Sequence, residues 1–135
     1  MEKQLKSVAK FHKAFGQEDG KWPTLIPTSE FDLRHSLMKE ENDEYLEACY
    51  NKSIVEVADA LGDQLYILCG TILKHGMQNI IEDVFDEIQA SNMSKLGENG
   101  KPLLREDGKI LKGPGYFRPE LSKFIKVETD ASSSI

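Results

Sequence analysis

Residues 40–63 read E-E-N-D-E-Y-L-E-A-C-Y-N-K-S-I-V-E-V-A-D-A-L-G-D and carry two pairs of acidic residues at helical spacing. Glu41 and Glu44 are three residues apart, and so are Glu56 and Asp59. On a helix, such residues project from one side about a turn apart, where like charges repel each other unless something neutralises them. Four carboxylates around one space suit a hard divalent cation with oxygen ligands. We predict Mg²⁺ as this cation, with Mn²⁺ able to substitute.

The neighbours of these acids predict that the carboxylates face inward. Glu41 and Glu44 continue an apolar stripe that includes Leu37 and Ala48. The following helix, expected at residues 54–75, is apolar over most of its surface and is therefore predicted to be mostly buried. Ionised carboxylates in such surroundings must be paired, protonated or bound to a metal.

Ordinary roles for the acids stay open beside the metal. Ser53 and Glu56 form S-x-x-E, a capping box that starts a helix without any cation. The acidic run 40–47 also fits a solvated helix face. The alternative function is therefore a non-catalytic helical metal-binding or interaction protein. A di-iron carboxylate bundle would use E-x-x-H on two helices, and the sequence has no such motif.

Composition bounds the class of protein. The chain has 135 residues, of which 39% are hydrophobic, enough for one domain with one core. A net charge of −6 disfavours a nucleic-acid surface, which needs a clustered basic face. Cys49 and Cys69 lie in expected helices and are predicted to be buried free thiols of a cytosolic protein. No apolar leader precedes the first helix and no apolar run approaches the length of a membrane span, so no membrane partner is expected.

Periodicity predicts an all-α fold. The expected helices are residues 2–15, 29–50, 54–75 and 79–95. The stretch 17–28 contains Gly20, Trp22, Pro23 and Pro27, which favours an irregular loop. We predict a four-to-five-helix bundle in a single domain over residues 1–124, with a disordered tail at 125–135.

The segment after the last helix differs in character. Turn signals at Asn99-Gly100 and Asp107-Gly108 predict a small loop or hairpin. Its basic residues are Lys101, Arg105, Lys109, Lys112 and Arg118. This excess of positive charge fits either a solvated loop or an electropositive lid over phosphate groups.

Several motifs together resemble the all-α nucleoside triphosphate pyrophosphohydrolases, the superfamily of MazG, dimeric dUTPases and phosphoribosyl-ATP pyrophosphohydrolase. The motifs are E-E-x-x-E at 40–44, E-x-x-D at 56–59, S-N-M-S-K at 91–95 and G-K-I-L-K-G-P-G-Y-F-R-P at 108–119. The resemblance spans roughly residues 5–120 and is strongest for the MazG-like, phosphoribosyl-ATP-pyrophosphohydrolase-like group.

The resemblance implies a helical bundle that binds Mg²⁺ and cleaves a nucleoside triphosphate between its α and β phosphates, releasing the monophosphate and pyrophosphate. The metal ligands implied for this sequence are Glu41, Glu44, Glu56 and Asp59. Glu40, with Glu41, is the candidate catalytic residue that orients or deprotonates the attacking water. Asp63 is a reserve ligand, because Ala60 stands where some relatives have the first acid of a second E-x-x-D.

Substrate contacts and assembly complete the expectations. Asn92 and Lys95 match the substrate-contacting end of a helix in the family. We expect Lys109, Lys112 and Tyr116 to close over the triphosphate. Trp22 is the best aromatic candidate to stack on the base, although burial is the commoner role of an aromatic side chain. Relatives build their sites at subunit contacts, so a homodimer or homotetramer is expected.

Overall fold

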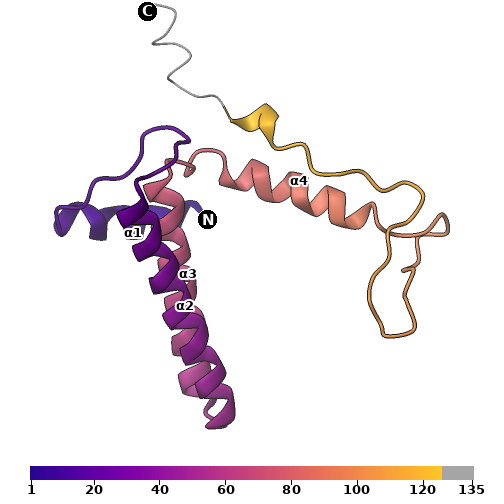
Figure 1. Ribbon diagram of the computed structural model, residues 1–135, viewed down its shortest axis with the longest axis horizontal. Helices are drawn as coiled ribbons and strands as arrows, with labels where there is room; N and C mark the ends of the chain where they lie inside the picture. Colours follow the sequence, from indigo (N-terminus) through magenta and orange to yellow (C-terminus); the bar gives the residue numbers. More distant parts are fainter. Residues whose placement is uncertain (126–135) are drawn as a thin grey trace, which may run out of the picture. The chain divides into compact units, whose positions relative to one another are not determined.

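A computed structural model describes residues 1–125 and is helical throughout its regular parts (Figure 1). Its elements are α1 (Glu2–Ala14), α2 (Thr28–Tyr50), α3 (Ile54–Lys74), α4 (Ile81–Met93) and a 3₁₀-helix, η1 (Ser122–Phe124). The predicted all-α fold is therefore confirmed, with each long helix within two residues of its expected bounds. Among these residues, no helix combines the length and apolarity needed to cross a membrane. Residues 126–135 of the predicted tail lie outside the described part.

The described residues form two compact units. The first runs from Met1 to Asn79 and contains α1, α2 and α3. The second begins at Ile80 and contains α4 and the segment that follows it. A single domain over 1–124 stays a prediction.

Helices α2 and α3 form an antiparallel hairpin that carries the acidic stretch. The turn is only three residues long, and Lys52 takes a left-handed conformation there with φ of 54°. Ser53 then caps α3, because its side-chain oxygen accepts the backbone N–H of Glu56 at 3.2 Å. This is half of the predicted capping box.

The core of the first unit lies where α1 packs on the C-terminal half of α3. Leu5 and Val8 of α1 are buried, as are Cys69, Ile72 and Leu73 of α3. Nearer the turn, the contact between α2 and α3 is made by small residues, Ala48 and Ala60.

The loop between α1 and α2 is irregular, as predicted, and is fixed to the C-terminal end of α3. Gly20 N–H donates to Leu73 O and Thr24 N–H donates to His75 O, both at 2.9 Å. At Gly76, φ is +67° and a Cβ atom would lie 2.1 Å from Trp22 O. Glycine is needed at position 76 on both counts.

The predictions of burial were too broad. On α3, Leu61, Leu65 and Leu68 are 50%, 41% and 45% exposed. Cys49 is exposed rather than buried. Periodicity identifies an apolar face of a helix, but it does not say whether this chain alone covers that face.

In the second unit, Ser91 of α4 and Ser94, which follows α4, bind the C-terminal segment through their side chains. Ser91 Oγ donates to Phe117 O at 2.8 Å, and Phe117 N–H donates to Ser94 Oγ at 3.1 Å. Ser91 is 2% exposed. Gly113 N–H donates to the carbonyl oxygen of Lys95 at 2.8 Å. The segment is therefore tied to the end of α4 by two serine side chains and one backbone hydrogen bond.

The predicted hairpin is present as a minimal one. Leu104 and Ile110 form an isolated antiparallel bridge, and Arg105 N–H donates to Lys109 O at 2.8 Å. Gly108 has a φ of +86°, which the Asp107-Gly108 turn requires.

Candidate metal centre

Three carboxylates gather where the middle of α2 faces α3. Glu41 and Glu44 come from α2 and Asp63 comes from α3, and one oxygen from each lies within 4.8 Å of the others. Glu41 is half-buried, Asp63 is half-buried and Glu44 is exposed. The group is therefore open to solvent on one side.

The electrostatics of the group are unfavourable without a counterion. Burial, a hydrogen bond with Glu44 and the charges of Glu44, Asp63 and Glu40 together raise the pKa of Glu41 to about 7. Glu41 Oε2 is buried and has no hydrogen-bond partner among the described residues. A divalent cation would supply both the missing partner and the missing positive charge. The donor set, three carboxylates in reach of one another, fits such an ion.

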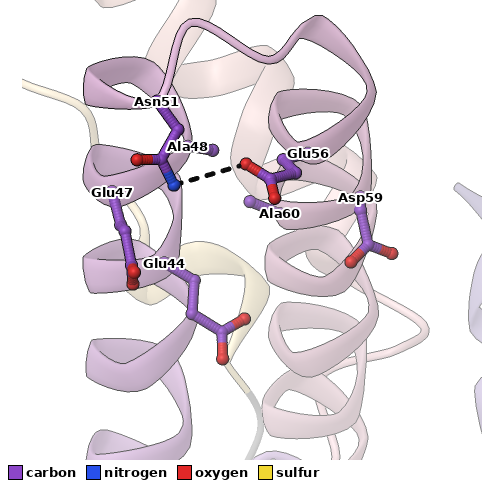
Figure 2. A pocket seen from close by; sticks show the side chains of 7 residues that line it. All are labelled: Glu44, Glu47, Ala48, Asn51, Glu56, Asp59 and Ala60. Carbon is purple, nitrogen blue, oxygen red and sulfur yellow. Dashed lines mark hydrogen bonds between the residues drawn. The ribbon is translucent and has the colours of Figure 1, made fainter.

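A pocket of about 250 Å³ adjoins the group on the side of the helix turn (Figure 2). It is lined by Glu44, Glu47, Ala48, Asn51, Glu56, Asp59 and Ala60. Figure 2 shows the Glu44 side chain reaching from α2 toward α3, and Asn51 Nδ2 donates to Glu56 Oε2 at 3.5 Å. The pocket is therefore acidic, and Glu44 belongs both to it and to the carboxylate group.

The structure divides the predicted ligands between these two places. Glu41 and Glu44 lie in the carboxylate group, whereas Glu56 and Asp59 are exposed and line the pocket. Asp63, the reserve ligand, is the α3 residue within reach of Glu41. The four-ligand set stays a prediction. Helical periodicity could have favoured Asp63, which lies two turns from Glu56 on one face.

Two further predicted residues of the first unit are not members of the carboxylate group. Glu40 is exposed and lines a surface hollow that also includes Glu44 of the group. Trp22 is 41% exposed, and its backbone contacts Gly76. Gly76 is thirteen residues along the chain from Asp63, about 20 Å at the rise of an α-helix. The roles of Glu40 and Trp22 stay predictions.

The remaining predicted substrate contacts belong to the second unit. Asn92 and Lys109 are exposed, and Lys95 is half-buried. Lys112 Nζ lies 4.7 Å from the centroid of the Tyr116 ring, a cation–π contact. These roles also stay predictions.

Sequence reasoning missed a polar network in the first unit. Arg34 of α2 is buried and bonds to α3, and the buried His12 contacts Asp19 at 2.5 Å. Asn42 also accepts a hydrogen bond from Gln64 at 2.9 Å, beside the carboxylate group. No motif marks Arg34 or Asn42, because their partners are far away in the sequence.

Comparisons with known proteins identify a family and a similar solved structure. The chain matches the family described as phosphoribosyl-ATP pyrophosphohydrolase over residues 8–92. Among solved structures it is similar to a "putative NTP pyrophosphohydrolase" from Exiguobacterium sp. 255-15, with 23% identity, 98% of each chain covered and a TM-score of 0.48. No curated protein matches the chain. The family match covers more than half of the 135 residues and confirms the predicted resemblance, so the chain belongs to the phosphoribosyl-ATP pyrophosphohydrolase family.

Proposed function

We propose that this chain is a Mg²⁺-dependent nucleoside triphosphate pyrophosphohydrolase that cleaves the α–β phosphate bond of an NTP or dNTP. Membership of the family indicates a pyrophosphohydrolase. The single observation that carries the rest is the group of Glu41, Glu44 and Asp63, with its buried and unpartnered Glu41 oxygen. Such a group is costly unless it holds a cation, and a triphosphate needs a cation to approach carboxylates.

In this proposal, Glu41, Glu44 and Asp63 hold the cation, and Glu56 and Asp59 complete the acidic wall beside it. A bound divalent ion supplies charge neutralisation for the leaving pyrophosphate and lowers the pKa of water. Glu40 or Glu41 accepts the proton of the attacking water.

Polar, basic and aromatic side chains complete the proposal by contacting the substrate. Asn92, Lys95, Lys109, Lys112 and Tyr116 are proposed to contact phosphate groups, and Trp22 to contact the base. Phosphoryl transfer needs positioning and charge balance rather than a covalent nucleophile, so donors of this kind are required. A cytosolic location and a homo-oligomeric state are part of the same proposal.

A nucleotide panel tests the reaction. The protein is incubated with each common NTP and dNTP and with Mg²⁺, and pyrophosphate and orthophosphate are measured separately. We expect pyrophosphate and a monophosphate as products, with no turnover in EDTA. Glu41→Gln should lose at least about 100-fold in kcat/KM. Glu18→Gln, in the loop after α1, is the matched control and should keep full activity.

The outcomes separate the alternatives. Release of orthophosphate would contradict cleavage at the α–β bond. Binding of Mg²⁺ without turnover of any nucleotide would favour the non-catalytic metal-binding protein instead. Equal activity of Glu41→Gln and the parent would remove the carboxylate group from the mechanism.

A further inference from the structure

Arg34 is a buried cation that joins α2 to α3 through directional contacts. Its side chain is on α2, and the residue is only 6% exposed. Nε donates to Thr71 Oγ1 at 3.0 Å, and a terminal nitrogen donates to the carbonyl oxygen of Ile67 at 2.8 Å. Thr71 Oγ1 also donates to Ile67 O at 3.0 Å. The guanidinium is thus held at one place along α3.

The absence of a side chain at Gly70 leaves space for the guanidinium. A Cβ atom at Gly70 would lie 2.6 Å from the Arg34 terminal nitrogen and 3.1 Å from His12 Nε2. Only glycine leaves that space free. Asp19 contacts the buried His12 at 2.5 Å and exerts a favourable electrostatic interaction on Arg34. The buried charge therefore has a nearby counter-charge.

The packing of Arg34 against Gly70 determines which residues of α2 and α3 face each other at the carboxylate group. Arg34 and Glu41 are seven residues apart on α2, and Asp63 and Gly70 are seven residues apart on α3. Seven residues are about two helical turns, so both pairs span the same length on one face. In an antiparallel hairpin, placing Arg34 at Gly70 therefore places Glu41 at Asp63.

Apolar packing alone does not fix this register. Hydrophobic burial is non-directional, and the buried apolar residues of α2 and α3 on the turn side of the group are the small Ala48 and Ala60. The carboxylates themselves repel one another and would favour a slip that separates them. Besides Arg34, the three-residue turn and the hydrogen bond between Gln64 and Asn42 resist such a slip, and both of these side chains are more exposed than Arg34.

We propose that Arg34 is a positioning residue, whose contacts with Ile67, Gly70 and Thr71 fix the register of α2 on α3 and so hold Glu41 and Glu44 opposite Asp63. Buried polar groups that specify the register of packed helices are a known use of such interactions. The importance of this register for catalysis rests on the proposed function. The register itself does not, and it can be measured without metal or nucleotide.

Pulsed electron spin resonance measures the register. Spin labels are attached to cysteines at Asp32 on α2 and Ala58 on α3, which are both exposed, with Cys49→Ser removing the exposed native thiol. Labelled chains are diluted with unlabelled ones, so that only distances within a chain are recorded. The parent should give one narrow distance distribution. Arg34→Met should broaden it or shift its mean by up to about 5 Å, the pitch of one helical turn.

A second variant acts on the same contact while keeping Arg34. Gly70→Ala places a methyl group against the guanidinium, so it should shift the distribution in the same way. Thr71→Val removes one acceptor and serves if either of the others fails to fold. Val8→Ala is the matched control, because it weakens the buried contact of α1 without touching the α2–α3 contact. It should lower the melting temperature and leave the distance distribution unchanged.

Affinity for Mn²⁺ is the second readout. Arg34→Met and Gly70→Ala should bind Mn²⁺ about 10-fold to 100-fold more weakly than the parent, as for the loss of a group that orients metal ligands. Val8→Ala should match the parent. Unchanged distances in folded Arg34→Met, Gly70→Ala or Thr71→Val would overturn the positioning role. Failure of the parent to bind Mn²⁺ would instead overturn the proposed metal centre, while the distances still decide the role of Arg34.

Discussion

Glu41 is the residue whose ionisation links stability to pH. Its pKa is raised to about 7 in the folded protein, from an ordinary value near 4.5, mainly by burial and then by Glu44 and the nearby charges. Between these two values the folded state binds more protons than the unfolded state, so stability falls as pH rises through this window. In EDTA, Glu41→Gln should therefore melt a few degrees above the parent at pH 8, and the difference should shrink toward pH 5. Parallel melting curves at all pH values would refute this.

Asp63 is the residue whose substitution best tests which carboxylates bind the metal. The structure places it within reach of Glu41 and Glu44, whereas Glu56 and Asp59 border the adjoining pocket. We predict that Asp63→Asn weakens Mn²⁺ binding as strongly as Glu41→Gln, by at least about 10-fold. Glu56→Gln and Asp59→Asn should cause smaller losses. Isothermal titration of the four variants ranks them, and a larger loss in Asp59→Asn than in Asp63→Asn would restore the ligand set expected from the E-x-x-D motif.

At the scale of the element, α4 and the segment after it form one structure through serine side chains. Ser91→Ala removes the donor to Phe117 O, and the variant should lose about 1 kcal/mol of local stability. Hydrogen exchange should rise at residues 113–118 and stay unchanged in α2 and α3. Ser122→Ala, whose side chain is exposed, is the control. Uniformly faster exchange in both units would show that the serine supports the whole chain rather than this segment.

The minimal β-hairpin with the Leu104–Ile110 bridge, and the residues after it, can be tested by truncation. A chain that ends at Leu96 should keep its affinity for Mn²⁺, raise KM and lower kcat together, because both ground-state and transition-state phosphate contacts would be lost. A chain that ends at Phe124 should behave like the parent. Normal kinetics in the shorter chain would remove Lys109, Lys112 and Tyr116 from the proposed site.

Local signals in the sequence predicted the elements well, and long-range pairings less well. Ser53, Gly16 and Gly76 mark helix ends through capping and left-handed backbone, which are properties of a few neighbouring residues. The proximity of Glu41 to Asp63 depends on how two helices pack, which the spacing within one helix does not give, and Glu56 and Asp59 of the E-x-x-D motif stay predicted ligands. Arg34 carried no signal at all, because a buried cation is recognised only by its partners on another helix.

At the scale of the molecule, the described chain leaves an apolar face of α3 exposed to solvent. Leu61, Leu65 and Leu68 recur at helical spacing and are 41–50% exposed. Exposed apolar side chains gathered on one face are typical of an interaction surface, and we predict a symmetric homodimer or a dimer of dimers. Sedimentation should show it at micromolar concentration, and Leu65→Glu should dissociate it. Leu25→Glu, in the loop before α2, should not. A monomeric parent chain would contradict the prediction.

The three-residue turn between α2 and α3 has a consequence for how the protein folds. Helices joined by a short turn make contacts between residues close in sequence, and such contacts form early because little loop entropy opposes them. The hairpin is therefore a natural folding nucleus, and the same step brings Glu41, Glu44 and Asp63 together. Their mutual repulsion then acts on the folding barrier itself. A divalent cation would relieve that repulsion as the hairpin closes, so the ion proposed for the folded site would also accelerate folding.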